Sequence, residues 1–372
     1  MSSDYVFACY LCKEEFLPSP SILKCAVCDS ALDVKYVHPS TATTDTGILR
    51  MPLPLKTPSD KFSLGEGNTP TINLNNLSNW LGINLLTKNE AQNPTGSFKD
   101  RGTSILISSI RSFGIEEIVE DSSGNAGSSI SAYSAAAGIK AHIFAPESAP
   151  QPKINQIKVY GAVHHSVHGS RDKVTEVAKK YALDNNLIYA SHNLSPYFIE
   201  GTKSFGYELL SDRKSTFPSD IVIPVGNGSL YLGIYKAMNE LLKSNHIERM
   251  PKMHFIQSES VKPIAAAARN EPWHGNMVTA TKAGGIAVGS PPRIDQVINA
   301  MKASDGQCDT VQENEIIDWQ LKLAQWEGIY SEPTSAAAFA GTFKLIESKK
   351  IAKGSTVLVP VTGSGLKDLS PI

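Results

Sequence analysis

The sequence lacks the features that mark membrane, secreted and nucleic-acid-binding proteins. No apolar run in its 372 residues approaches the roughly 20 residues that a helix needs to cross a bilayer. The formal net charge is −1, so no overall positive field attracts nucleic acid or an anionic membrane. The first residues, MSSDYVFACYLCKEEF, lack the basic start and apolar stretch of a secretory signal. We therefore expect a cytoplasmic protein without nucleic acid or membrane among its partners.

Cysteine is also scarce, but its placement is informative. Four of the five cysteines form two Cys-X-X-Cys pairs separated by twelve residues. In a cytoplasmic chain this spacing favours a tetrahedral zinc site over disulfides, and four thiolates leave no open position for catalysis. The alternatives are a degenerate ribbon that holds no metal and a pair of redox-active motifs. We expect a zinc-ribbon-like segment over residues 1–38 whose metal ligands are Cys9, Cys12, Cys25 and Cys28.

The rest of the chain alternates between strand-like and helix-like stretches. It follows a linker-like segment, residues 38–60, that is rich in Thr, Pro and Ser. Apolar, β-branched runs such as IVIPV and TVLVPV end in turn residues, and amphipathic stretches such as RDKVTEVAKKYALDNN separate them. This order indicates an α/β fold whose parallel sheets are covered by helices on both faces. Ligands of such sheets bind in the loops at the carboxyl ends of the strands.

One lysine stands in an unusual context, the segment NEAQNPTGSFKDRGTS. Lys99 lies between Phe98 and Asp100, after a run of small and turn-forming residues. A lysine that attacks an aldehyde must be partly neutral, and an apolar wall or a nearby positive charge favours the neutral amine. Phe98 and Arg101 are the neighbours that offer such a wall and such a charge. Lys99 is therefore a candidate for a Schiff base, although most lysines are solvated surface residues.

Three turns that follow predicted strands are candidate ligand loops. Gly226 and Gly228 follow IVIPV and precede a predicted helix, so their N–H groups can hold a phosphate. The loop is not a nucleotide P-loop, and it lacks the Gly-X-Gly-X-X-Gly spacing of dinucleotide-binding proteins. The loop at residues 122–125 suits a carboxylate or a ring hydroxyl, although Ser123 or Asn125 could simply cap the next helix. Thr362 offers a hydroxyl at a third strand end.

Five motifs in fixed order make the chain similar to the threonine synthase family of pyridoxal phosphate enzymes. They are NPTGSFKDRG, SSGNAGSS, VGNGSL, SEPTSAAA and TGSGLKD, and the resemblance runs from Gly65 to Asp368. It implies fold type II, which is similar to the tryptophan synthase β subunit, with two α/β lobes beside the ribbon. The large cofactor-binding lobe would comprise residues 39–95 and 200–372, and the smaller mobile lobe residues 96–199. Relatives of this type are commonly homodimers, and we expect a homodimer here.

The resemblance also implies roles for individual residues. Lys99 would hold the aldehyde of pyridoxal 5′-phosphate as a Schiff base and then move protons at the substrate carbons. Phe98 would line the cofactor ring, Asn125 would bind its ring hydroxyl, and Thr362 would face its nitrogen. Because Thr362 is a neutral hydroxyl, that nitrogen would be less firmly protonated than opposite a carboxylate. The substrate carboxylate would bind Ser122, Ser123 and Gly124, and the cofactor phosphate would bind Gly226, Asn227, Gly228, Ser229 and Leu230.

The substrate-phosphate part of the family pattern does not match. Where relatives have NSxNPxRLEGQK, this chain has SHNLSPYFIEGTK, so that Phe198 replaces the arginine that grips a phosphate. His192 and Asn193 replace an Asn and a Ser, and Ser364 replaces a His. The segment AGGIAVGSPPR is closer to related lyases than to the family pattern. Arg293 or Lys153 could supply another anion contact, but a solvated surface cation is the simpler interpretation of each.

We therefore expect a lyase that eliminates or replaces a group at the β or γ carbon of a small amino-acid substrate. By resemblance the reaction converts O-phosphohomoserine to threonine and phosphate. Because of Phe198, the alternative is an ammonia-lyase or β-replacement reaction on another amino acid. A nicotinamide-dependent oxidoreductase and a non-catalytic protein that binds a partner through the ribbon are the other classes considered.

Overall fold

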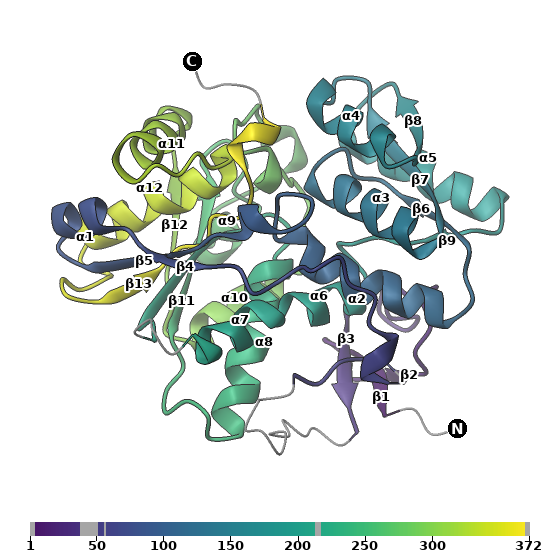
Figure 1. The fold of residues 1–372 in the computed structure, drawn as a ribbon, viewed down its shortest axis with the longest axis horizontal. Coiled ribbons are helices and arrows are strands. Elements are labelled where there is room, and N and C mark those ends of the chain that lie inside the picture. The colour runs from purple at the N-terminus through teal and green to yellow at the C-terminus, as the bar shows by residue number, and fades with distance from the viewer. Residues whose placement is uncertain (1–3, 38–50, 56, 213–216, 369–372) are drawn as a thin grey trace. The chain divides into compact units, whose positions relative to one another are not determined.

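The structure, a computed structural model, describes residues 4–37, 51–55, 57–212 and 217–368 (Figure 1). Residues 38–50 of the predicted linker therefore lie outside the described residues. The chain divides into two units and passes from one unit to the other after Glu66, after Phe98 and after Thr202. We call them the small-sheet unit (Met1–Glu66 and Lys99–Thr202) and the large-sheet unit (Gly67–Phe98 and Lys203–Ile372).

The small-sheet unit contains a parallel sheet and an antiparallel ribbon. The sheet has the strand order β8-β7-β6-β9, and all its neighbouring strands are parallel. The ribbon has the order β2-β1-β3. The strands of this unit are β1 (Tyr5–Cys9), β2 (Glu15–Phe16), β3 (Leu32–Tyr36), β6 (Glu117–Glu120), β7 (Lys140–Pro146), β8 (Val163–Val167) and β9 (Ile188–Tyr189). Its helices are η1 (Pro58–Asp60), α2 (Lys99–Ser112), α3 (Asn125–Ala137), α4 (Gln151–Val159), α5 (Arg171–Asp184) and α6 (Pro196–Thr202).

The two faces of the small sheet pack against different helices. Successive strand side chains point to opposite faces, so adjacent residues enter different cores. Ile118 belongs to the cluster that contains Ile130 and Tyr133 of α3. Its neighbour Val119 belongs to a separate cluster with Val174 of α5. Both faces are therefore covered, as the sequence predicts for a parallel sheet.

The large-sheet unit has six strands in the order β12-β11-β10-β13-β5-β4. All neighbours are parallel except the edge strand β4, which is antiparallel to β5. The strands are β4 (Thr71–Asn73), β5 (Asn84–Lys88), β10 (Asp220–Pro224), β11 (Lys252–Ser258), β12 (Cys308–Val311) and β13 (Thr356–Leu358). The helices are α1 (Asn75–Leu81), η2 (Glu90–Gln92), α7 (Ser204–Ser211), α8 (Ser229–Lys243), α9 (Pro263–Arg269), η3 (Gly275–Met277), η4 (Gly284–Ile286), α10 (Ile294–Ala303), α11 (Glu313–Glu327), α12 (Pro333–Glu347) and η5 (Gly365–Lys367).

The α/β fold with parallel sheets and a cysteine-bearing ribbon, which the sequence predicts, is confirmed. The unit boundaries differ from the lobe boundaries expected at residues 38, 95 and 199, because the N-terminal segment packs within the small-sheet unit. Tyr36 of β3 lies 2.6 Å from the carboxylate of Glu200 on α6, and Glu66 lies 2.8 Å from the hydroxyl of Tyr133 on α3. The lobe ranges themselves stay a prediction. Among the described residues, no helix has the length and apolar character to span a membrane.

Candidate active site

Lys99 is the first residue of α2 and is half-buried. Its Nζ lies 5.6 Å from the centre of the Phe198 ring, which is fully buried. The ring fits there because Gly102 has no side chain: a Cβ at Gly102 would lie 2.6 Å from the ring. Phe198 of α6 is thus an apolar surface beside Lys99, and the surface that the sequence assigns to Phe98 stays a prediction. Sequence reasoning missed this contact because it joins segments a hundred residues apart in the chain.

The serine-rich loop joins the carboxyl end of β6 to the start of α3. The N-cap residue of α3 is Gly124, and no side chain caps the helix there, so Ser123 and Asn125 are not its N-cap. The Ser122 hydroxyl instead accepts a hydrogen bond from the Gly124 N–H at 3.3 Å. A Cβ at Gly127 would lie 1.9 Å from the Ser122 carbonyl oxygen, so only glycine allows the loop to approach α3 this closely. The uncapped first turn of α3 can bind a carboxylate.

A buried histidine–carboxyl pair lies in the same unit as Lys99. His192 Nδ1 is 2.6 Å from Glu120 Oε1 at the end of β6, and both residues are buried. The His192 ring is also 5.7 Å from the Phe198 ring, centre to centre, in an edge-on arrangement. Burial raises the pKa of Glu120 well above its usual range. Burial and the charge of Lys99 hold the pKa of His192 well below its usual value. Both shifts favour the uncharged forms of the two side chains, with one proton in the hydrogen bond between Glu120 and Nδ1.

Asp121, next to Glu120, has the opposite electrostatic surroundings. Burial opposes its ionisation, but Arg171, whose Nη2 lies 3.1 Å away, and the Thr175 hydroxyl hold its pKa below the usual value. The negative charge of Asp121 in turn contributes to the raised pKa of Glu120. The pKa values of the two adjacent carboxyls thus shift in opposite directions, because Asp121 forms an ion pair with Arg171 whereas burial dominates at Glu120.

The predicted phosphate loop, residues 226–230, joins β10 to α8 in the large-sheet unit. Gly228 has a φ of +86° and is the N-cap residue of α8, so no side chain caps that helix. A Cβ at Gly228 would lie 2.6 Å from Val297, and a Cβ at Gly226 would lie 3.0 Å from the Gly285 carbonyl oxygen. Both positions therefore favour glycine, and the main-chain N–H groups of the uncapped first turn lie at the positive end of a 15-residue helix.

Thr362 follows β13 and lies in a buried hydrogen-bond cluster. Its hydroxyl donates to Glu332 Oε1 at 2.7 Å and lies 2.9 Å from the Ser335 hydroxyl. Its carbonyl oxygen accepts from the N–H of Phe98 at 3.0 Å, which connects this strand end to the residue before Lys99. Glu332 and Ser335 belong to the SEPTSAAA motif, but sequence reasoning assigned neither to the site. A Glu directly before a Pro is common at the start of a helix, so the local sequence does not indicate that Glu332 belongs to the site.

The structure distributes the predicted site residues over both units. Lys99, Ser122, Ser123, Gly124 and Asn125 belong to the small-sheet unit. Phe98, Thr362 and the loop at 226–230 belong to the large-sheet unit, and the chain passes from one unit to the other at the Phe98–Lys99 peptide bond. In each unit these residues lie at carboxyl ends of parallel strands or at starts of helices. Folds with open parallel sheets bind their ligands at these positions.

Two further residues of the sequence analysis have definite positions. Arg293 is 1% exposed at the start of α10, and its Nη1 donates to Gln296 Oε1 at 2.8 Å. The interpretation of Arg293 as a solvated surface cation is therefore wrong, because a buried guanidinium needs protein partners. Ser364 caps η5 through its side chain, which accepts from the Leu366 N–H.

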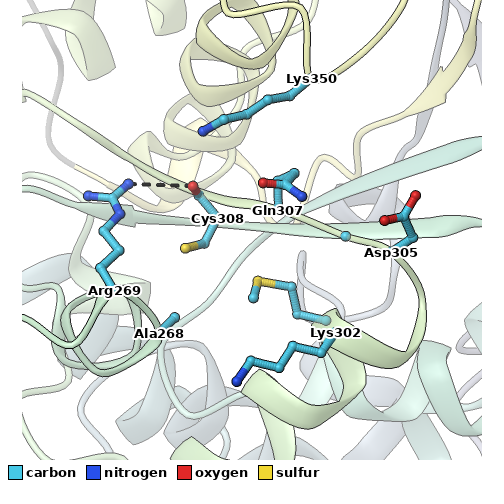
Figure 2. A pocket seen from close by; sticks show the side chains of 9 residues that line it. Ala268, Arg269, Lys302, Asp305, Gln307, Cys308 and Lys350 are labelled. Carbon is cyan, nitrogen blue, oxygen red and sulfur yellow. Dashed lines mark hydrogen bonds between the residues drawn. The ribbon is translucent and has the colours of Figure 1, made fainter.

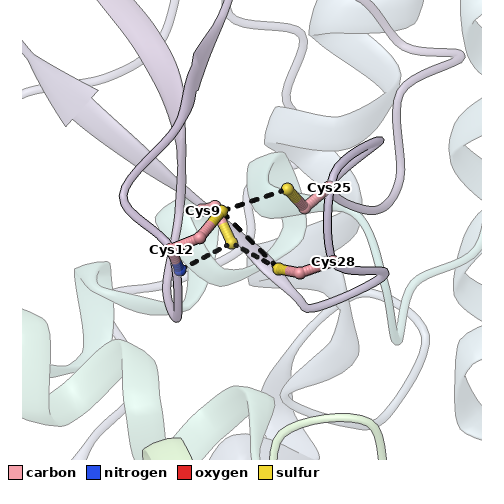
Figure 3. Close-up of side chains that lie close together, drawn as sticks. All are labelled: Cys9, Cys12, Cys25 and Cys28. Carbon is pink, nitrogen blue, oxygen red and sulfur yellow. Dashed lines mark hydrogen bonds between the residues drawn. The ribbon is translucent and has the colours of Figure 1, made fainter.

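The four ribbon cysteines converge on one point (Figure 3). Their sulfur atoms all lie within 4.8 Å of one another, with Cys9–Cys28 at 3.4 Å and Cys12–Cys25 at 3.5 Å. A tetrahedral zinc ion with Zn–S bonds of about 2.3 Å requires sulfur atoms about 3.8 Å apart. The donor set and its spacing therefore fit a structural zinc ion.

None of the candidate site residues lines a pocket of about 410 Å³ in the large-sheet unit (Figure 2). Several of its lining residues lie at the amino-terminal end of β12, whereas candidate site residues such as Thr362 follow the carboxyl ends of strands. Its cations Arg269 and Lys302 stand in the last turns of α9 and α10, where they compensate the helix dipoles. Arg269 also pairs with Asp309 at 3.3 Å. We assign no ligand to this pocket.

Comparison with known proteins identifies the class. Residues 62–363 match the family described as pyridoxal-phosphate dependent enzyme. The fold is also that of solved enzymes of this class: maize serine racemase (TM-score 0.69, 21% identity, 80% of this chain and 88% of that one) and the serine racemase of Dictyostelium discoideum (0.67, 23%, 82% and 94%). The chain is therefore a pyridoxal-phosphate dependent enzyme of fold type II, as the sequence predicts.

The sequence relatives narrow the family further. The threonine synthase of Methanocaldococcus jannaschii is 36% identical over 85% of this chain and 79% of its own length. That of Methanosarcina acetivorans is 31% identical over 98% of this chain and 92% of its own length. The chain belongs to the threonine synthase family, whose members are lyases. This assignment decides against the nicotinamide oxidoreductase and the non-catalytic alternatives.

The residues of the chain fit the cofactor of this family. The glycine turn at 226–230, which we call the glycine cradle, precedes the uncapped start of α8 and so suits a phosphate, and Lys99 supplies the amine that an aldehyde requires. The buried hydroxyl of Thr362 suits contact with a ring nitrogen.

Proposed function

We propose that the protein binds pyridoxal 5′-phosphate through Lys99 and eliminates or replaces a group at the β or γ carbon of an amino acid. The observation that carries the proposal is the glycine cradle at 226–230, together with an amine that begins a helix beside a buried ring. When bound, the cofactor withdraws electrons and so stabilises negative charge on the substrate carbons. Phe98 lines its ring, Asn125 binds its hydroxyl, and the main chain of Gly226, Asn227, Gly228, Ser229 and Leu230 holds its phosphate.

Residues of the small-sheet unit bind the substrate and move its protons. Ser122, Ser123 and Gly124 bind the substrate carboxylate at the uncapped start of α3, where the helix dipole favours an anion. The amine of Lys99 takes and returns protons at the substrate carbons. The Phe198 ring excludes water from one side of that amine.

The first candidate reaction converts O-phosphohomoserine to threonine and phosphate. The relatives at 31–36% identity, which are named threonine synthases, support it. The second candidate is an ammonia-lyase or β-replacement reaction on an amino acid without a phosphate. It is favoured by one observation: the position of the family's phosphate-gripping Arg holds the fully buried Phe198, beside a neutral His192–Glu120 pair. A phosphate dianion needs a cationic partner such as Arg.

Product analysis separates the two reactions. The purified protein, loaded with cofactor, is incubated with O-phosphohomoserine, and inorganic phosphate and threonine are measured. In parallel it is incubated with serine and threonine, and ammonia and 2-oxo acid are measured. Release of phosphate with threonine supports the first reaction. Release of ammonia and 2-oxo acid without phosphate release supports the ammonia-lyase reaction, and the absence of both phosphate and threonine contradicts the first reaction.

We also propose that Cys9, Cys12, Cys25 and Cys28 hold one structural zinc ion, supported by their tetrahedral spacing. Elemental analysis of the purified protein should find one zinc per chain, and Cys12→Ser with Cys28→Ser should abolish it. A homodimer and a cytoplasmic location stay predictions.

A further inference from the structure

His192 follows the strand next to the one that leads into the proposed carboxylate loop. It comes after β9, and β9 pairs in parallel with β6, whose carboxyl end continues into residues 122–124. The Ala190 N–H donates to the Val119 carbonyl oxygen at 2.7 Å, so the two strand ends lie side by side. Both strands belong to the small-sheet unit. His192 thus lies at the edge where parallel sheets bind ligands.

The two ring nitrogens of His192 have different surroundings. Nδ1 lies 2.6 Å from Glu120 Oε1, and the His192 main-chain N–H donates to Glu120 Oε2 at 3.3 Å. Nε2, on the far side of the ring from Nδ1, has no hydrogen-bond partner among the residues that the structure describes. The residue is only 5% exposed, and a polar atom buried to this degree normally has a partner. Nε2 is therefore available to a ligand.

The buried ring of Phe198 connects His192 to Lys99. Its centre lies 5.7 Å from the centre of the His192 ring and 5.6 Å from the Nζ atom of Lys99. Because Phe198 is fully buried, it keeps water away from both groups on this side. The amine that would take a substrate proton and the unpartnered imidazole nitrogen thus flank one apolar ring.

Hydrogen positions follow from the uncharged forms of the pair. Burial raises the pKa of Glu120 and lowers that of His192, and the charges of Lys99 and Arg171 also disfavour a second ring proton, against that of Asp121. Since Glu120 Oε2 accepts the main-chain N–H, the carboxyl hydrogen lies on Oε1 and points to Nδ1. A neutral imidazole has one hydrogen, which then lies on Nε2. Unlike a hydroxyl hydrogen, it cannot rotate away.

We infer that His192 is a catalytic residue that gives its Nε2 proton to an oxygen leaving the β carbon, so that the substrate is a β-hydroxy amino acid. The inference rests on the proposed function and selects the second of its two candidate reactions. A hydroxyl group is a poor leaving group and needs a proton donor, whereas phosphate departs as a stable anion. An uncharged donor beside Phe198 therefore suits a hydroxyl group better than a phosphate dianion.

Two protons move in this elimination. The Lys99 amine takes the proton of the α carbon, and the electron pair of that C–H bond forms the double bond to the β carbon. The C–O bond breaks, its electron pair leaves with the oxygen, and the Nε2 proton of His192 completes a water molecule. The Glu120 proton then moves to Nδ1. Solvent carries the proton gained by Lys99 back to Nε2 while the Nδ1 proton returns to Glu120, so no other reactant is needed.

Substrates whose leaving groups differ in their need for a proton test this role. The holoprotein and its His192→Asn variant are compared on serine, threonine and β-chloroalanine, and release of 2-oxo acid is measured. Chloride leaves without a proton. We expect the variant's kcat on the hydroxy amino acids to fall about 10²–10⁴-fold and its kcat on β-chloroalanine to stay within about threefold. Equal losses on all substrates in a folded variant would indicate a structural role and overturn the inference.

His142→Asn is the matched control. His142 is a buried histidine of the same sheet, and its Nε2 lies 2.6 Å from a carboxylate oxygen of Glu117. This second pair involves the first residue of β6, at the opposite end of that strand from Glu120. The kcat values of His142→Asn on all three substrates should therefore equal those of the wild type.

A second readout uses the wild type alone and does not depend on turnover. In holoprotein labelled with ¹⁵N in histidine, long-range ¹H–¹⁵N NMR correlations show which ring nitrogen carries the hydrogen, and contacts with the Phe198 ring assign His192. We expect the hydrogen on Nε2, and a hydrogen on Nδ1 would overturn the inference. Elimination of chloride without action on either hydroxy amino acid would also overturn it, but would leave the proposed function intact. A protein that binds no cofactor would overturn the proposed function itself.

Discussion

At the residue scale, Glu120 and Asp121 show how neighbouring carboxyls acquire different charges. Arg171 and Thr175 stabilise the ionised form of Asp121, whereas Glu120 faces His192, which burial keeps neutral. The result is a buried pair without net charge beside Lys99 and Phe198. An uncharged pair in this position suits a substrate group that carries no double negative charge.

The raised pKa of Glu120 predicts a specific dependence of stability on pH. The folded protein keeps the proton on Glu120 at a pH where the unfolded chain has released it. Taken alone, Glu120 lowers the free energy of unfolding as pH rises from the unfolded pKa of Glu, about 4.3, toward the folded pKa, by up to about 1.4 kcal/mol per pH unit. The lowered pKa of His192 has the opposite effect, because it raises the free energy of unfolding up to the unfolded pKa of His, about 6.5. Glu120→Gln removes the first contribution and leaves the second, so its free energy of unfolding should rise relative to that of the wild type between pH 5 and pH 7, as urea denaturation at both values will measure.

Glu117, on the same strand, is the matched control for this measurement. Hydrogen bonds from Lys140 and His142 hold its pKa below the usual value, so its contribution has the opposite sign. Its stabilising effect is present above the unfolded pKa and is lost as pH falls through the folded pKa. Glu117→Gln should therefore show the same change in the free energy of unfolding between pH 5 and pH 7 as the wild type. The wild-type change in Glu120→Gln would contradict the role assigned to Glu120.

Gly127→Ala tests the close approach of the serine-rich loop to α3. The new Cβ would lie 1.9 Å from the Ser122 carbonyl oxygen, so the loop must move. Overpacking of this kind costs about 1–3 kcal/mol of stability, and displaced serines should also raise the KM for the amino-acid substrate. Gly275→Ala is the control, because no atom lies within 4 Å of the position that a Cβ would take there. Equal stability and KM in both variants would contradict the proposed carboxylate site.

At the scale of elements, the ribbon is fastened to α6 by side chains from β1 and β3. The hydroxyl of Tyr5 is 3.2 Å from that of Tyr197, and the Phe7 and Tyr197 rings lie 5.1 Å apart, centre to centre. Tyr36 of β3 bonds Glu200 of the same helix. Since α6 also carries Phe198, the ribbon supports the helix that places the ring beside Lys99.

Tyr36→Phe tests this support. The variant loses the hydroxyl that lies 2.6 Å from Glu200 Oε2 and 3.0 Å from the Pro52 carbonyl oxygen. The expected loss of stability is about 1–3 kcal/mol, because Glu200 is fully buried. Chemical denaturation measures it against Tyr160→Phe, a partly buried tyrosine of the same unit. If both variants were equally stable, the Tyr36 hydroxyl would not fasten the ribbon.

Local signals made the strands and glycine loops predictable, whereas contacts between distant segments were not. IVIPV followed by two glycines and an amphipathic helix predicts β10, the cradle and α8, because each step depends on neighbouring residues. Phe198, Glu332 and the burial of Arg293 have no such signal. Phe198 and Glu332 each depend on what a distant segment packs against them: Gly102 for Phe198 and Thr362 for Glu332.

At the scale of the whole molecule, the family match and the threonine synthase relatives agree with the motif order of the chain. The proposed cofactor-binding residues are spread over both units, from Lys99 to Thr362. Phe198 and His192, where the sequence analysis finds the substrate-phosphate pattern changed, lie in the small-sheet unit. The substrate is therefore the property to measure.

The most direct test of the account is to locate the covalent attachment of the cofactor. The holoprotein is treated with borohydride, which makes the bond between an amine and the cofactor aldehyde permanent, and its peptides are mapped by mass spectrometry. The account predicts the modification on Lys99 and its loss in Lys99→Ala. An unmodified Lys99 in protein that carries the cofactor, or a label on another lysine, would contradict it.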